Sequence, residues 1–179
     1  MRKTLPLFLI AASAAWCQSP NPAGWGKIVW GMTVAEARAA LGPAATTPTE
    51  TPGPNLALID RLMLAGIPIG NLTAEAAIQT APGSDKVSAV TLSVGDLYDN
   101  PANRSAAFTT LQRLLTEKYG PPKVEPIHSA GRSGTIRNVL WTFPATSITL
   151  TWHESSGRYG IGYVRIRYEA VDHKASDVL

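Results

Sequence analysis

The side chains best suited to chemistry lie in the last third of the chain, which holds its three histidines, at positions 128, 153 and 173. His153 is followed directly by Glu154, and a histidine beside a carboxylate can serve as a general acid–base pair or supply metal ligands. The pair lacks the second histidine of a zinc-protease helix, however, and it lies in strand-like sequence. We therefore predict no metal site here, and the pair supports a single enzymatic alternative, a small exported hydrolase.

Residues 131–135, GRSGT, approach a second chemical pattern, the nucleophile elbow Gly-x-Ser-x-Gly. The last position holds Thr135 where the sharp turn requires glycine, so a hairpin loop explains the segment better. No glycine-rich loop joins a strand to a helix in the manner of a phosphate site, and no carboxylates have the character of a glycosidase pair. The sequence thus predicts no catalytic residues and no cofactor.

A set of polar and aromatic residues faces outward on three consecutive predicted strands, over residues 137–143, 147–152 and 159–169. Neighbouring strands bring such alternate residues side by side, and aromatic and arginine side chains are enriched in protein interfaces. We predict an interaction face made of Thr142, Thr149, Thr151, His153, Tyr163, Arg165 and Arg167. The alternative is a solvated sheet face, in which threonine and arginine are also expected.

The element that must position these strands is a long amphipathic helix between Ala106 and Pro122. Asn100 and Pro101 are typical of a helix start, and Gly120 followed by two prolines is typical of a helix end. Apolar residues recur here every three or four positions, which places them on one face of the helix. They are Ala107, Phe108, Leu111, Leu114 and Leu115.

A shorter helix is predicted upstream, because Thr33 and Glu36 have capping-box spacing and the Gly-Pro pair at 42–43 ends the pattern. Strand-like segments follow it over residues 56–64, 71–80 and 86–94. In the first of these, alternation puts Leu56, Leu58, Leu62 and Leu64 on one face. Gly66 and Pro68 predict a break in the chain before the second.

The order of helix and then several strands thus occurs twice, in residues 25–97 and 98–170. We predict a single α+β domain with two layers: an antiparallel sheet with both helices on one face, built from two tandem helix-plus-strands units. The second unit begins its strands with an edge strand over 123–128. Residues 18–24 form a mobile leader, and residues 171–179 form a polar tail.

The first 17 residues are predicted to be a signal peptide. Arg2 and Lys3 precede a short apolar run at 5–15, followed by small residues. The run is shorter than the ~20 residues that span a bilayer, so we expect no transmembrane segment in the mature chain. The sole cysteine, Cys17, follows bulky Trp16 where a lipoprotein signal wants a small residue, so we expect a periplasmic or secreted protein without a lipid anchor.

The charge balance argues against nucleic acid as a partner. The formal net charge is +3, but Arg2 and Lys3 belong to the predicted signal peptide, and 14 basic residues then remain against 13 acidic ones. A near-neutral chain lacks the basic surface that nucleic-acid binding requires.

The motif Gly31-Met32-Thr33, followed by Glu36 and by Leu41-Gly42-Pro43, resembles the opening of the small outer-membrane assembly lipoprotein family. The tandem arrangement is similar to that of the beta-lactamase inhibitor protein family, whose two helix-plus-sheet repeats form a saddle. The resemblance implies an exported module that binds a protein, performs no catalysis and has no assigned site residues. We expect a non-enzymatic binding module that contacts a protein or envelope component. The alternatives are the hydrolase above and an envelope structural protein without a discrete ligand.

Overall fold

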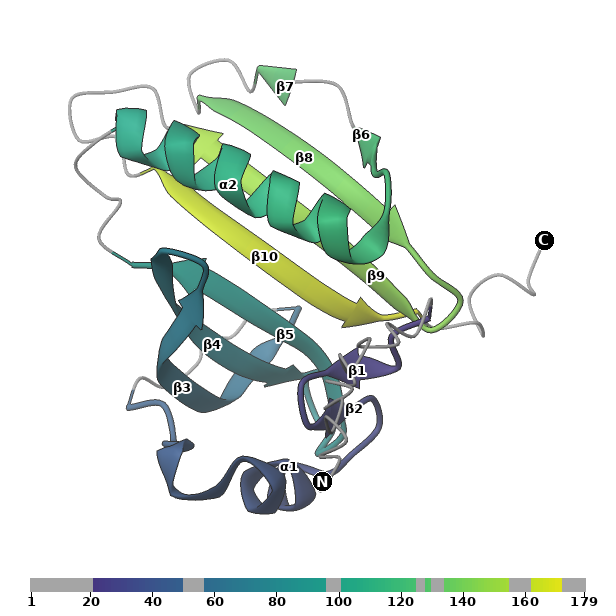
Figure 1. Cartoon of the computed structure of the whole chain (residues 1–179). Coiled ribbons are helices and arrows are strands. Elements are labelled where there is room, and N and C mark those ends of the chain that lie inside the picture. Colours follow the sequence, from purple (N-terminus) through teal and green to yellow (C-terminus); the bar gives the residue numbers. More distant parts are fainter. Residues whose placement is uncertain are drawn as a thin grey trace, which may run out of the picture.

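The computed structural model describes residues 21–49, 57–95, 101–124, 128–129, 134–154 and 162–171. Antiparallel strands and helices make up these residues, which confirms the α+β class (Figure 1). The main sheet has eight strands in the order β3-β4-β5-β10-β9-β8-β6, with β7 also paired to β8. Its long strands are β3 (Ile59–Ile69), β4 (Leu72–Thr80), β5 (Val87–Val94), β8 (Thr135–Thr142), β9 (Thr146–Glu154) and β10 (Tyr163–Ala170).

Helix α2 (Pro101–Tyr119) lies across β8, β9 and β10 in Figure 1 and confirms the central helix of the sequence. Gly120 ends it with a φ of 85°, and the Gly120 N–H donates a hydrogen bond to the carbonyl of Thr116. The left-handed conformation costs glycine little because it has no Cβ. Four of the five predicted apolar residues are buried against the sheet, Ala107, Phe108, Leu111 and Leu115.

Helix α1 (Val34–Leu41) also begins and ends where expected. The Glu36 N–H donates to the Thr33 hydroxyl oxygen, and the Glu36 carboxylate accepts from the Thr33 N–H, which completes the capping box. A 3-10 turn, η1 (Gly42–Ala44), follows. The buried side chain of Ala37 belongs to the same core cluster as the apolar face of α2.

The inner faces of the strands form that core. The period-two alternation of the sequence is confirmed at Ala74, Ala76 and Ile78 of β4 and at Val90, Leu92 and Val94 of β5, all of which are buried, while Ala77 and Ala89 are buried in addition. At the centre of the sheet, Ile166 of β10 lies between Leu92 of β5 and Leu150 of β9. A small hairpin of β1 (Gly24–Trp25) and β2 (Ile28–Val29) adds buried Ile28.

The break predicted at Gly66 and Pro68 is wrong, since both residues lie inside β3. A register shift between Leu64 and Ile67 absorbs the extra residue as a bulge, in which Gly66 has a φ of 71°. Pro68 is tolerated because β3 is at the sheet edge, where a missing N–H breaks no ladder.

A second register shift, between Asp60 and Leu62, interrupts the alternation expected over 56–64. Leu62 and Leu64 pair with inward-facing residues of β4, as predicted, but Leu58 precedes the strand. Leu56 lies outside the described residues. Of the four leucines expected on one face, only Leu62 and Leu64 are therefore confirmed there.

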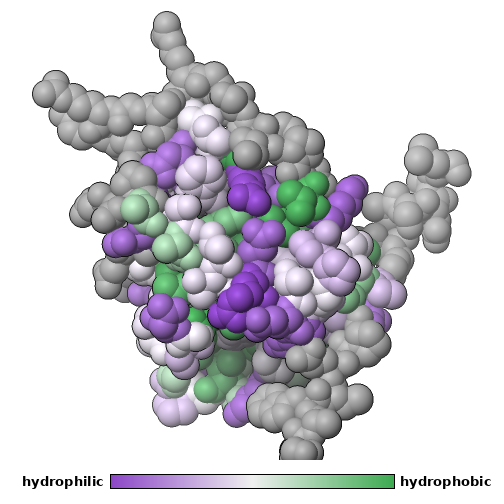
Figure 2. Space-filling model, turned by 45° about the horizontal axis from the view of Figure 1, so that its top comes forward, coloured by the Kyte–Doolittle hydropathy of each residue, from purple (hydrophilic) through white to green (hydrophobic). Residues whose placement is uncertain are grey.

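The edge strand predicted over 123–128 appears as two short strands, β6 (Lys123–Val124) and β7 (His128–Ser129), with 125–127 outside the description. The predicted signal peptide, residues 18–20 of the leader and residues 172–179 of the tail also lie outside it. Among the residues that are described, no helix is both long and apolar enough to cross a bilayer. On the face seen from above α2, hydrophilic residues gather near the centre and apolar residues form small patches among them (Figure 2).

Candidate functional site

Strand pairing places all seven residues of the predicted interaction face on one side of the sheet. The register of β9 and β10 gives three directly opposite pairs, Tyr163–His153, Arg165–Thr151 and Arg167–Thr149. Thr142 of β8 lies opposite Ser147, two residues before Thr149 on β9. Residues that are directly opposite share a face, and the alternate residues of these strands are buried toward α2. The interaction face is therefore the side of the sheet away from that helix.

The centre of the interaction face is a contact between three side chains. The rings of His153 and Tyr163 are stacked, with centroids 4.9 Å apart and planes inclined by 17°. The guanidinium carbon of Arg165 lies 4.2 Å from the Tyr163 ring centroid, within cation–π range. An aromatic surface beside a cation can contact both an apolar group and an anion of a partner.

Two polar atoms of the interaction face are buried without a hydrogen-bond partner among the described residues, His153 Nδ1 and Arg167 Nε. A buried polar group left unpaired costs about 1–3 kcal/mol. Arg167 Nη2 does reach the Glu169 carboxylate at 2.9 Å, but both side chains are 42% exposed, and such surface pairs contribute little.

The structure extends the interaction face into the first half of the chain, which sequence reasoning missed. Arg165 lies opposite Ser93 of β5, and Arg167 lies opposite Thr91. Beside them is a polar hollow of about 160 Å³ lined by Asp60, Met63, Glu75, Ala77, Gln79, Thr91, Ser93 and Arg165. The alternation in β4 and β5 was visible in the sequence, but the pairing of β5 with β10 joins residues more than 70 positions apart and leaves no local signal.

A chain of hydrogen bonds fixes one wall of the polar hollow. The Thr91 hydroxyl donates to the Gln79 side-chain oxygen at 2.9 Å, and the Gln79 amide donates to the Asp60 carboxylate at 2.7 Å. Because these side chains restrain one another across β3, β4 and β5, this wall needs little reordering on binding.

No protein-family model, curated protein or solved structure matches this chain. The resemblances drawn from the sequence therefore stay predictions, and the function has to be argued from geometry.

The geometry separates His153 from Glu154, the pair considered for a hydrolase. His153 lies on the interaction face, whereas the Glu154 carboxylate accepts two hydrogen bonds from Arg104 of α2, from Nε at 3.0 Å and from Nη2 at 2.5 Å. Adjacent residues of a strand point to opposite faces. An acid–base couple needs both groups at one substrate, and these two are on different sides of the sheet.

The other chemical patterns give no site in the described part of the chain. No group of three histidine, cysteine or acidic side chains is placed there to hold a metal ion. Of the elbow-like segment, residues 131–133 lie outside the description, while Gly134 leads into β8 and Thr135 is its first residue. An elbow turns from a strand into a helix, and this segment enters a strand instead.

Proposed function

We propose that this chain is an exported, non-enzymatic module that binds a protein of the cell envelope through its interaction face. The observation that carries the proposal is the contact of His153, Tyr163 and Arg165 at the centre of a sheet face, while α2 packs its apolar side chains against the other side. Tyrosine and arginine at the centre of a patch are typical of residues that dominate binding free energy.

The order of the elements supports the same proposal. Each half consists of a helix followed by three long antiparallel strands, and the sheet order is symmetric about the pair β5 and β10. We infer two copies of one unit joined through their third long strands. A partner could then contact both copies at once, through the interaction face on one side of the seam and the polar hollow on the other.

The partner chemistry follows from the central arginine. Among the described residues, the Arg165 guanidinium contacts the Tyr163 ring but forms no ion pair. A protein that presents a carboxylate next to an apolar or aromatic side chain would pair with the arginine and cover the tyrosine. We propose a partner with that surface.

The test combines capture with substitution. A partner is first captured from the envelope fraction, and its affinity is then measured for the wild type and for Tyr163→Ala and Arg165→Ala. Each substitution should weaken binding by more than about 1 kcal/mol. Arg113→Ala, an exposed change on α2, is the matched control and should leave the affinity unchanged.

The denaturation midpoint of Arg165→Ala completes the test, because Arg165 is exposed, whereas Tyr163 is half-buried, and exposed substitutions change stability by less than about 0.5 kcal/mol. Stability lost with affinity kept would show that the face is packed core, and no change in either quantity would show a solvated sheet surface. A cellular protein that retains Met1 and stays in the cytoplasm would contradict export.

A further inference from the structure

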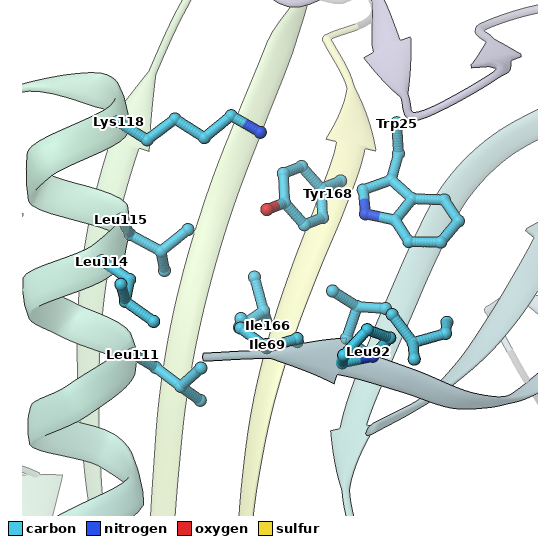
Figure 3. A pocket seen from close by; sticks show the side chains of 11 residues that line it. Trp25, Ile69, Leu92, Leu111, Leu114, Leu115, Lys118, Ile166 and Tyr168 are labelled. Atoms are coloured by element: carbon cyan, nitrogen blue, oxygen red, sulfur yellow. The ribbon is translucent and has the colours of Figure 1, made fainter. Parts of the chain in front are cut away.

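An apolar cavity of about 210 Å³ lies on the other side of the sheet from the interaction face, between α2 and the far end of β3. Its floor is Leu92 of β5 and Ile166 of β10, the two side chains that meet at the seam of the halves. Figure 3 shows the leucines of α2 facing Trp25 and Ile69 across this space. The space is partly open to solvent, so a small molecule has a route into it.

The polar groups of the cavity are at one end. Lys118 extends from the last turn of α2 toward Tyr168 (Figure 3). The lining side chains from the preceding turns of α2, Leu111 and Leu114, are apolar. The Lys118 ammonium is 5.1 Å from the Tyr119 ring centroid and has no ion pair with a described residue. The cavity thus combines an apolar body with one cationic end, which fits a molecule with an apolar tail and an anionic head.

Tyr168 adds a neutral hydroxyl at the same end. Burial, together with electrostatic repulsion from the Tyr119 phenol and a hydrogen bond to it, raises the pKa of Tyr168 well above its ordinary value. The hydroxyl therefore stays protonated at physiological pH and does not repel an anion. Figure 3 shows its oxygen directed toward α2, the element that carries Lys118.

We propose that this cavity binds a medium-chain fatty acid, with the alkyl chain between α2 and β3 and the carboxylate at Lys118. The size follows from volume: an apolar cavity of about 150 Å³ holds the six carbons of benzene, so 210 Å³ holds a chain of about eight carbons. The proposal is independent of the protein partner, since the cavity and the interaction face lie on opposite sides of the sheet.

Isothermal titration of the purified protein with straight-chain fatty acids tests the size. Each added methylene from butanoate to octanoate should raise the affinity by about fourfold, the effect of burying one CH₂, and the gain should stop near octanoate. An absence of binding by octanoate, or an affinity that rises unchanged through dodecanoate, would overturn the proposal.

The head group is tested with a ligand of opposite charge and with a matched lysine pair. Octylammonium should bind more weakly than octanoate by at least tenfold, and Lys118→Gln should abolish most of that preference. Lys86→Gln, an exposed lysine at the other end of β5, should keep the wild-type preference. Equal binding of the two head groups, or equal effects of the two lysine substitutions, would contradict the assignment of Lys118.

The wall is tested at Leu114, a half-buried residue that lies beside the turn at Gly70, so its substitution is tolerated more readily than one in the core. Leu114→Trp should block octanoate with an unchanged melting temperature. Leu114→Ala should move the best chain length beyond octanoate, which keeps the test valid if the tryptophan variant fails to fold. An optimum that stays at the same length in Leu114→Ala would place the ligand elsewhere.

Discussion

At the scale of single residues, Arg104 is a charged side chain in the core. It is only 2% exposed, and its guanidinium holds the Glu154 carboxylate, which is 27% exposed. A Cβ added at Gly162 would lie 2.4 Å from Arg104 Nε, so only glycine fits beside it. This contact ties the first turns of α2 to the end of β9 and the approach to β10. Because Glu154 serves this contact, its carboxylate points away from the sheet face that carries His153.

Removal of the Glu154 carboxylate should therefore be costly. Glu154→Ala removes the carboxylate that accepts from Arg104 Nε and Nη2, and losing these buried hydrogen bonds to a charged group should cost about 1–3 kcal/mol of stability. Glu169→Ala is the matched control, because it removes a similar pair with Arg167 that is exposed, and it should cost less than about 1 kcal/mol. Urea denaturation of both variants measures the difference. Similar losses of stability for the two variants would mean that burial does not determine how much the Arg104–Glu154 pair contributes to stability.

The capping box of α1 predicts a specific response to acid. The N–H and hydroxyl of Thr33 both donate to the Glu36 carboxylate, and these hydrogen bonds lower the pKa of Glu36 from its ordinary value. A lowered pKa in the folded state adds stability above the unfolded pKa, and that stability is lost as the pH falls through the folded pKa. Below about pH 4.5, the melting temperature of Glu36→Gln should depend less on pH than the melting temperature of the wild type does. The same pH dependence in the variant and the wild type would show that the Glu36 carboxylate does not accept these hydrogen bonds from Thr33 in solution.

At the scale of elements, local chemistry was enough to predict both helices. The capping box, the apolar spacing and the terminal Gly-Pro pairs each act within one or two turns, so they are readable without knowledge of the fold. Strands β4 and β5 were readable for the same reason. The continuity of β3 was not, because Gly66 and Pro68 are tolerated only in an edge strand, and edge position is set by distant pairing.

The central helix gives the clearest stability prediction at this scale. Leu111 is fully buried against the sheet, whereas Arg113, two residues later, is exposed. Leu111→Ala should lower the free energy of unfolding by about 2–5 kcal/mol through lost burial and a remaining cavity. Arg113→Ala should change it by less than about 0.5 kcal/mol. Chemical denaturation measures both changes. Equal denaturation midpoints for the two variants would mean that Leu111 is not on the buried face of α2.

At the scale of the whole molecule, the sequence predicted one half of the extended polar surface and missed the other. The seven residues of the interaction face come from three strands consecutive in the chain, so their grouping followed from order alone. The polar hollow depends on β5 lying next to β10. That pairing is non-local, and only the suspected repetition of a helix with several strands pointed to it.

The same seam predicts how the molecule unfolds. Five residues of β10, from Arg165 to Glu169, pair with β5, and Leu92 and Ile166 are buried where the halves meet. A separate half would expose one of these strands as an open edge and would bury only the marginal core of a domain of about 70 residues. We therefore expect one cooperative unfolding transition for the whole protein, with fluorescence and far-UV circular dichroism giving the same midpoint. Leu92→Ala should lower that midpoint without dividing the transition. Residues 98–170 alone should show no cooperative transition, and a native-like melting curve for this fragment would mean that the halves are independent domains.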